Sequence, residues 1–181
     1  MRFSVFLLVS LLLFNCKEEK EQNLDSQDNI EIAEEPKGDD KFKFDFDFET
    51  SVPDDFSITA NDVFMNNNQF MNVKVTHKLN ANETQKKIRF EFPENIVPDY
   101  QLMLSLGMKN EKKVTVKSIL LTYNETEFNV TPDKVEEYFT LNKFVEYNPE
   151  SGILTTKKVE GNHNPLLFVR KKILDSISSA K

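Results

Sequence analysis

Apolar and polar residues alternate strictly in the segment KFKFDFDFE, which begins at Lys41. Phenylalanine occupies every second position of 42–48, and lysine or aspartate fills the positions between. A period of two puts all the apolar side chains on one face of an extended strand, because successive side chains point to opposite sides. The same alternation recurs at 71–79, 88–92 and 100–106. We therefore predict four strands, each with one buried face.

The second half of the chain predicts strands that differ in burial. Three consecutive apolar residues begin at Ile119, so we expect strand 114–123 to be buried on both faces, or to bend. Shorter strands are predicted at 126–130, 139–147 and 153–159. Helical segments are predicted at 131–138, where Pro132 can open a helical turn, and at 169–177, where apolar residues lie four apart.

These elements predict an all-β fold, an antiparallel two-sheet, jelly-roll-like β-sandwich with a short helical turn and a short C-terminal helix. Turn residues separate the strands at the spacing expected of such a sandwich. A chain of 181 residues, 39% of them apolar, suits one modest domain, which we place at 41–181. Thirteen phenylalanines lie in that range and can fill the core without tryptophan, which the sequence lacks.

The first residues predict a signal peptide. An apolar run of about twelve residues follows Arg2, which is too short for the roughly 20 residues of a membrane-spanning helix. The run ends at Cys16, the only cysteine of the chain. One cysteine closes no internal disulfide. We assign 1–15 to the signal peptide and leave it out of the fold.

The segment Leu13-Phe14-Asn15-Cys16 resembles the lipobox of bacterial lipoproteins. The resemblance implies cleavage before Cys16 and attachment of lipid, palmitate among the acyl groups, to its thiol. Two or more acyl chains anchor a protein stably to a membrane, whereas one chain binds marginally. The expected location is the outer membrane, with the lipid anchor as the membrane partner.

Charge divides the chain into a tether and a nearly neutral body. Residues 17–40 hold three lysines and ten acids, a net charge of −7, with few apolar residues, so we predict a disordered tether over 16–40. Residues 41–181 hold 19 basic and 20 acidic residues, which leaves no basic footprint for nucleic acid. The tether's first residues, Lys17-Glu18-Glu19, resemble the export signal of Bacteroidota surface lipoproteins, which implies cell-surface display; the alternative is the periplasmic face.

Catalytic and metal-binding chemistry finds little support in the sequence. The chain has two histidines, and its cysteine is assigned to lipid, so no zinc site or cysteine nucleophile can be assembled. Asp54 and Asp55 follow a proline and are interpreted as turn residues, while Asp45 and Asp47 are expected on the solvated face of the first strand. We predict no enzyme activity, no cofactor and no metal ligands; whether an acidic loop binds a structural calcium stays open.

The candidate ligand-binding residues are aromatic and amide side chains at predicted strand ends and in one loop. Sugars stack on exposed aromatic rings and form hydrogen bonds with amides. A tyrosine followed by asparagine beside a polar loop can supply both contacts. The candidates are Tyr123, Asn124, Tyr147, Asn148, Asn162, His163 and Asn164. The alternative for each tyrosine is a half-buried ring, and the alternative for the asparagines is turn formation.

Several motifs of the body resemble the galactose-binding-like sandwich modules of Bacteroidota surface and glycan-processing proteins. They are a Leu-x-Leu-Gly strand end at 104–107, a long apolar strand ending in Tyr-Asn, and a Tyr-Asn-x-x-x-Gly turn at 147–152. The resemblance implies carbohydrate binding. We therefore expect a non-catalytic envelope lipoprotein that binds glycan or another envelope component. The alternative is a structural or assembly subunit that docks onto an outer-membrane protein complex.

Overall fold

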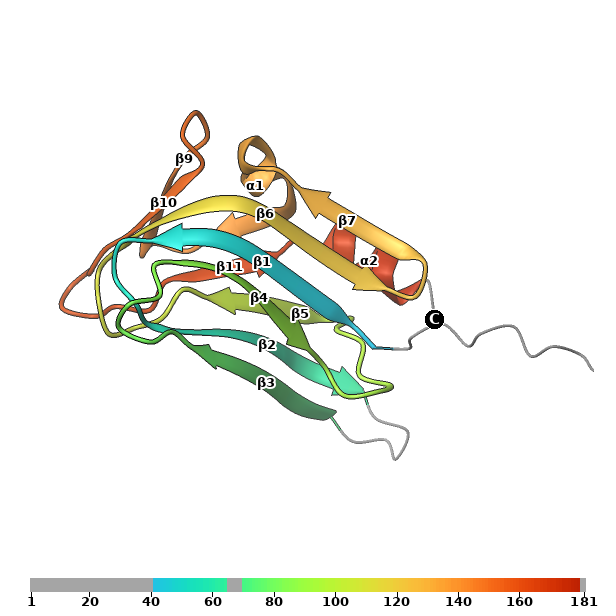
Figure 1. Cartoon of the computed structure of the whole chain (residues 1–181). Coiled ribbons are helices and arrows are strands. Elements are labelled where there is room, and N and C mark those ends of the chain that lie inside the picture. The colour runs from blue at the N-terminus through green and yellow to red at the C-terminus, as the bar shows by residue number, and fades with distance from the viewer. Residues whose placement is uncertain (1–40, 65–69, 180–181) are drawn as a thin grey trace, which may run out of the picture. The chain divides into compact units, whose positions relative to one another are not determined.

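The computed structural model describes residues 41–64 and 70–179. The predicted signal peptide at 1–15, the lipidation site Cys16 and the tether at 16–40 lie outside the described residues. Within the described part, the chain forms two antiparallel sheets packed as a sandwich, with short helical segments beside them (Figure 1). The predicted all-β, two-sheet fold is confirmed.

The two sheets contain six and five strands. Sheet 1 has the spatial order β4 (Gln85–Glu91), β1 (Lys43–Thr50), β6 (Lys113–Tyr123), β10 (Ile153–Thr156) and β9 (Val145–Asn148), and β7 (Thr126–Val130) pairs with β6. Sheet 2 has the order β3 (Phe70–Lys78), β2 (Asp55–Phe64), β5 (Gln101–Ser105), β11 (Leu166–Val169) and β8 (Phe139–Leu141).

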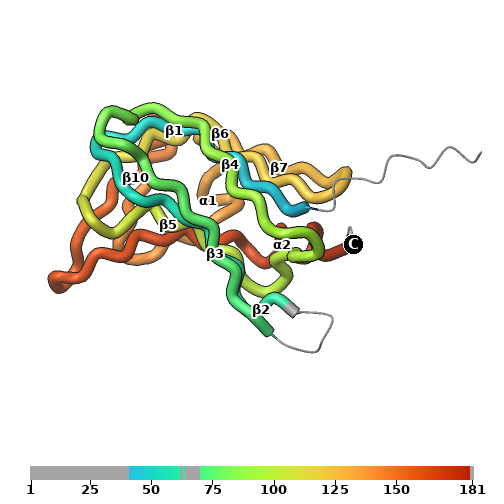
Figure 2. The backbone as a smooth tube through the Cα atoms, turned by 60° about the horizontal axis from the view of Figure 1, so that its bottom comes forward, coloured from blue at the N-terminus to red at the C-terminus, as the bar shows by residue number. Residues whose placement is uncertain are grey.

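Strands that follow one another in the chain occupy matching places in the two sheets. β1 and β2, β3 and β4, β5 and β6, β8 and β9, and β10 and β11 each cross from one sheet to the other. Because all pairings are antiparallel, these crossings gather at one end of the sandwich, on the left in Figure 1, and the chain can be followed across them in Figure 2. We call it the crossing end; its loops are 51–54, 79–84, 106–112, 142–144 and 157–165.

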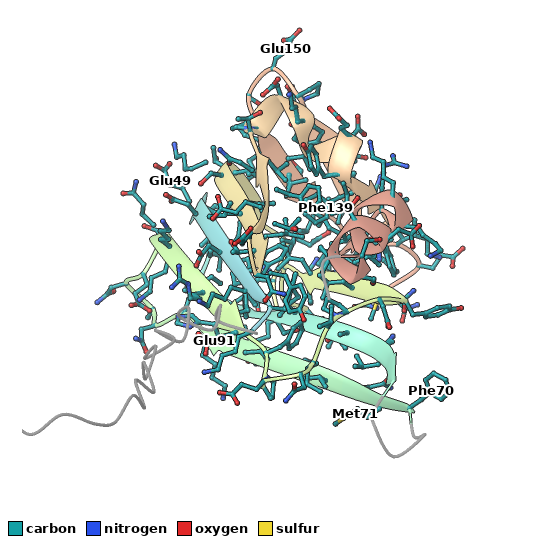
Figure 3. The ribbon with its side chains drawn as sticks, turned by 90° about the vertical axis from the view of Figure 1, so that its right-hand side faces the viewer. Glu49, Phe70, Met71, Glu91, Phe139 and Glu150 are labelled. Carbon is teal, nitrogen blue, oxygen red and sulfur yellow. The ribbon has the colours of Figure 1, made fainter. Side chains whose placement is uncertain are left out.

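Phenylalanines dominate the core between the sheets. Phe44, Phe46 and Phe48 are fully buried on the inner face of β1, as the alternation predicts. The Phe46 and Phe48 rings stack with centroids 4.4 Å apart, and Phe48 lies 4.6 Å from Phe56 of the opposite sheet. Phe139 of β8 also points into the interior (Figure 3). Burying one such side chain stabilises the fold by about 1.5–3 kcal/mol, so this pattern is a major source of its stability.

The outer face of β1 is less solvated than predicted. Asp45 was expected in water, but it is 5% exposed. Arg89 of β4, directly opposite in the register, donates from Nε and from one terminal nitrogen to the two carboxylate oxygens, each at 2.7 Å. A guanidinium that binds through two nitrogens shields the carboxylate from water and also supplies a hydrogen bond to each of its oxygens. The alternation fixes which face a residue occupies, and a cross-strand partner decides whether water reaches it.

The helical predictions hold, with shifted boundaries. The predicted turn at 131–138 is the 3-10 helix η1 (Pro132–Lys134) followed by α1 (Val135–Tyr138). The terminal helix α2 (Lys171–Ser178) begins two residues later than predicted, because Leu166–Val169 forms strand β11.

Several strand predictions needed correction. The single strand predicted at 139–147 is wrong, since the loop 142–144 divides it into β8 of sheet 2 and β9 of sheet 1. Strand β2, with Asp55 at its start, and strand β11 were not predicted, and the strand predicted at 153–159 ends at Thr156.

Candidate functional site

At the crossing end, the loop before β2 packs against the loop 106–112 through one buried carboxylate. Asp54 is 3% exposed. Its Oδ2 accepts hydrogen bonds from Lys112 Nζ at 2.6 Å and from the backbone N–H groups of Lys109 and Asn110 at 3.1 and 3.2 Å. Its Oδ1 accepts the N–H of Asp55 at 2.7 Å. Asp54 lies in the turn before β2, as the sequence predicts, and it also serves there as a buried structural anchor.

Lys112 completes this anchor from the other side. Its side chain is fully buried, and Nζ also donates to the carbonyl oxygens of Leu106 at 2.9 Å and Gly107 at 3.3 Å. An ammonium has three donors, and here each has an acceptor. The Asp54–Lys112 pair thus satisfies a buried charge of each sign and fixes the course of the loop 106–112.

The pKa directions at this pair follow from burial and hydrogen bonding. Burial alone would raise the pKa of Asp54, but the hydrogen bonds from Lys112 and from the backbone N–H groups of Asp55 and Asn110 outweigh it and lower that pKa. Burial lowers the pKa of Lys112 against the opposing effect of Asp54. Asp54 is therefore an ionised carboxylate at neutral pH, which suits an anchor and does not suit a proton donor.

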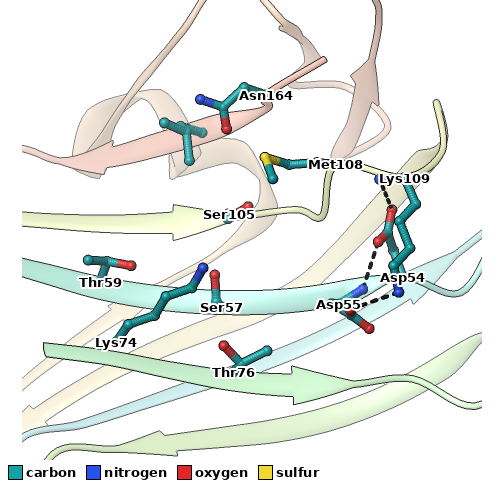
Figure 4. A pocket seen from close by; sticks show the side chains of 11 residues that line it. Asp54, Asp55, Ser57, Thr59, Lys74, Thr76, Ser105, Met108, Lys109 and Asn164 are labelled. Carbon is teal, nitrogen blue, oxygen red and sulfur yellow. Dashed lines mark hydrogen bonds and ion pairs between the residues drawn. The ribbon is translucent and has the colours of Figure 1, made fainter. Parts of the chain in front are cut away.

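Beside this anchor, the outer face of sheet 2 carries a groove (Figure 4) with a volume of about 260 Å³. Its floor contains the hydroxyls of Ser57 and Thr59 of β2 and of Ser105 of β5. Lys74 and Thr76 of β3 form one wall. Ser57 and Thr59 face outward because they alternate with residues of β2 that are buried in the core. Four hydroxyls and the Lys74 ammonium thus converge in the groove.

The other side of the groove comes from the crossing loops. Met108 and Lys109 close it at the crossing end, and Asn164 and Leu166 border it from the loop 157–165 and β11 (Figure 4). Lys109 Nζ donates to Asp55 Oδ2 at 2.8 Å, and this contact raises the pKa of Lys109.

Hydrogen bonds hold this rim in place. His163 Nδ1 lies 3.0 Å from the carbonyl oxygen of Met108, so Nδ1 carries the proton and donates it. Asn142 Nδ2 donates to the carbonyl oxygen of Asn164 at 2.7 Å, and Asn142 Oδ1 accepts the N–H of Leu166. Met108 keeps its side chain 59% exposed at the groove mouth. The rim is therefore largely formed before any ligand binds.

Only part of the predicted ligand-binding set reaches this groove. Asn164 lines it and His163 supports its rim. Asn162 lies next to them, where it closes a short hairpin with Val159. The loop 161–165 is thus placed beside a concave surface, as a binding role would need.

The two tyrosine pairs lie elsewhere and apart from each other. Tyr123 is 6% exposed at the end of β6 that is far from the crossing end, and Asn124 forms the turn after it with φ of 51°. Tyr147 pairs with Leu154, which pairs with Val114 at the opposite end of β6. At about 3.3 Å per residue along β6, the two tyrosines are roughly 30 Å apart. They do not form one site.

Tyr147 and Asn148 also have local structural roles. The Tyr147 hydroxyl is buried, and burial, together with the charges of Asp133 and Glu136, raises its pKa. Asn148 Oδ1 accepts the N–H groups of Glu150 and Ser151 and so shapes the turn before β10. The turn-forming alternative considered for the asparagines describes Asn148.

Sequence reasoning missed the hydroxyl groups of the groove. Ser57 and Thr59 lie on the unpredicted strand β2, yet the segment FSITA at 56–60 alternates between apolar residues and hydroxyl-bearing ones. That alternation could have identified a polar outer face on the strand. What it could not supply is the register that brings Ser57 opposite Thr76 on one side and Ser105 on the other.

Comparisons with known proteins do not extend this picture. No protein-family model matches the chain, and searches of curated proteins and of solved structures gave no match. In residues 41–64 and 70–179, no helix is long and apolar enough to span a membrane. Nor does this part of the chain bring three histidine, cysteine, aspartate or glutamate residues together as a metal site. Within the described part of the chain, the groove is the candidate site that the geometry supports.

Proposed function

We propose that this chain is a non-catalytic, lipid-anchored envelope protein whose β-sandwich binds a glycan in the groove on sheet 2. The observation that carries the proposal is the convergence of four hydroxyls, an amide and the Lys74 ammonium on a cavity of about 260 Å³. Hydroxyl and amide groups both donate and accept hydrogen bonds, which is what sugar hydroxyls require. The volume lies just below the roughly 300–1,000 Å³ of drug-sized ligand sites, so it suits about one sugar ring.

The state of the carboxylates supports binding rather than glycoside hydrolysis. Hydrolysis needs a protonated acid and a second free carboxylate flanking the scissile bond. Of the described residues that line the groove, the acids are Asp54 and Asp55. Asp54 is held ionised by Lys112, and Asp55 is paired with Lys109. Both carboxylates are engaged by lysines of the protein itself, so the groove is arranged to hold a ligand.

A bulky side chain on the groove wall should abolish glycan binding. Thr76 is exposed on β3, an edge strand of sheet 2, so Thr76→Trp should fold normally while its ring fills the groove. Thr140→Trp is the matched control, since Thr140 is also exposed on an edge strand of sheet 2, β8, and does not line the groove. We expect the detergent-solubilised full chain to retain glycans on an array, Thr140→Trp to retain the same glycans, and Thr76→Trp to lose them.

Two results would count against the glycan proposal. If the wild-type chain retains no glycan while a pulldown recovers an envelope protein, the ligand is a protein. If Thr76→Trp binds as well as Thr140→Trp, glycans bind outside the groove.

The lipid anchor has its own test. The full chain, expressed in a bacterial host with an alkyne analogue of palmitate, should become labelled and should fractionate with the outer membrane. Cys16→Ser should remove the label, because Cys16 is the only thiol in the sequence. A chain that stays unlabelled, or a label that survives Cys16→Ser, would refute lipidation at this residue. Digestion of intact cells with a protease then distinguishes surface display from the periplasmic face.

A docking role in an envelope complex is the second candidate function, and one surface favours it. Phe70 and Met71 at the start of β3 are 67% and 41% exposed (Figure 3), and Tyr100, just before β5, is 65% exposed. The register puts these residues at the end of sheet 2 that is far from the crossing end. Exposed apolar side chains grouped away from a polar site are typical of protein contacts. This surface could act alongside the groove.

A further inference from the structure

We infer that the groove selects an acidic sugar, a polyhydroxylated ring bearing one carboxylate, and that Lys74 binds this carboxylate. The inference rests on the proposed function, since it names the class of ligand for the same groove. It goes further because hydroxyl groups alone would not distinguish a neutral sugar from a charged one.

The charges around the groove leave one ammonium uncompensated. Asp54 is neutralised by Lys112 at 2.6 Å, and Asp55 by Lys109 at 2.8 Å. Lys74 lines the same groove, and its Nζ has neither an acidic partner nor a hydrogen-bond acceptor among the residues that the structure describes. The groove and its anchor therefore carry a net charge of +1, located at Lys74.

The position of Lys74 directs this charge into the groove. It pairs in register with Thr59 of β2, and its side chain extends over the floor toward the Ser57 hydroxyl (Figure 4). Thr76, two residues along β3, faces the same way and pairs with Ser57. A carboxylate beside Lys74 would thus meet one ammonium and several hydroxyl donors, which together satisfy both of its oxygens.

The chemistry of the lysine also limits the ligand. A lysine ammonium is a compact point charge, whereas recognition of a phosphate commonly uses the planar fork of arginine, which the described groove lining lacks. One positive charge balances one negative charge. A cavity of about 260 Å³ accommodates about one ring, so a single uronic-acid residue satisfies the size, the hydroxyl pattern and the charge together.

The test uses sugar pairs that differ only in charge. Disaccharides ending in glucuronate, galacturonate or mannuronate are titrated calorimetrically into the detergent-solubilised full chain, each beside its neutral parent. We expect at least one acidic sugar to bind roughly five- to tenfold more tightly than its parent at low salt. The preference should shrink as ionic strength rises, because the groove is open to solvent.

Substitutions at two lysines of the same strand locate the charge that matters. Lys74→Gln should remove the preference for the acidic sugar over its neutral parent, while Lys74→Arg should preserve it. Lys78→Gln is the matched control: Lys78 is exposed four residues along β3 on the same face, outside the groove. Unchanged preference in Lys74→Gln, or equal loss in both glutamine variants, overturns the inference. Equal binding of acidic and neutral sugars overturns it while leaving the proposed function intact, and no sugar binding at all overturns both.

Discussion

Replacing Lys112 by methionine should lower the free energy of unfolding by about 3–5 kcal/mol. Methionine keeps an unbranched side chain of similar length but has no ammonium. Asp54 would then remain buried with its backbone donors and without its charged partner. Breaking a buried ion pair on one side is costly because the remaining charge is shielded from water and has lost its counter-charge. Urea unfolding of the full chain at pH 7, followed by circular dichroism, measures the loss.

Lys109→Met is the control for this prediction. Lys109 also pairs with an aspartate at the crossing end, at 2.8 Å, but its side chain is 63% exposed. An exposed ion pair contributes about 0–1 kcal/mol, so this variant should stay close to the wild type. Equal losses in the two lysine variants would contradict the distinct role assigned to the buried pair.

Acid provides a second readout of the same pair. The folded state lowers the pKa of Asp54 below its ordinary value of 3.8, so its contribution to stability is complete above that pH and is lost as the pH falls through the folded pKa. Lys112→Met removes the side-chain hydrogen bond that lowers this pKa and leaves the burial that raises it. The variant should therefore lose less stability than the wild type between pH 5 and about pH 2.

The sequence predicted most strands because their burial is one-sided. In β1 and β4 the apolar residues keep a period of two, which is what a half-buried strand requires. Strand β2 was not predicted because its alternation of apolar and polar residues stops after Ala60. At that point the pairing register with β3 shifts, before Val63. The predicted strand 139–147 failed for a different reason. Apolar residues occur on both sides of 142–144, and the crossing there that moves the chain between sheets is a tertiary feature.

The candidate site was harder to predict because it depends on long-range contacts. Asp54 and Lys112 are 58 residues apart in the chain, so nothing near either residue indicates their pairing. Tyr123 and Tyr147 share a local pattern, a tyrosine at a strand end before asparagine, but the antiparallel pairing places them near opposite ends of β6. The loop 161–165 lies beside the groove because strand β11, which follows it directly, belongs to sheet 2.

Gly107→Ala should be the other strongly destabilising change, with a loss of about 2–4 kcal/mol. Gly107 has φ of +86°, where an L-residue is strained by about 1–2 kcal/mol. A Cβ at this position would also lie 2.4 Å from Cγ of Asp54. Asp54 cannot move away without breaking the hydrogen bonds from Lys112 and the loop backbone. The same urea titration measures this loss.

Gly161→Ala separates the two causes of that loss. Gly161 has φ of +77°, so alanine meets a similar backbone strain, but no atom lies within 4 Å of the added Cβ. It should therefore cost only about 1–2 kcal/mol. The difference between the two variants measures the clash with Asp54. If the two losses coincide, close packing of Gly107 on Asp54 does not stabilise the loop 106–112, and the groove rim formed by Met108 and Lys109 must depend on other contacts.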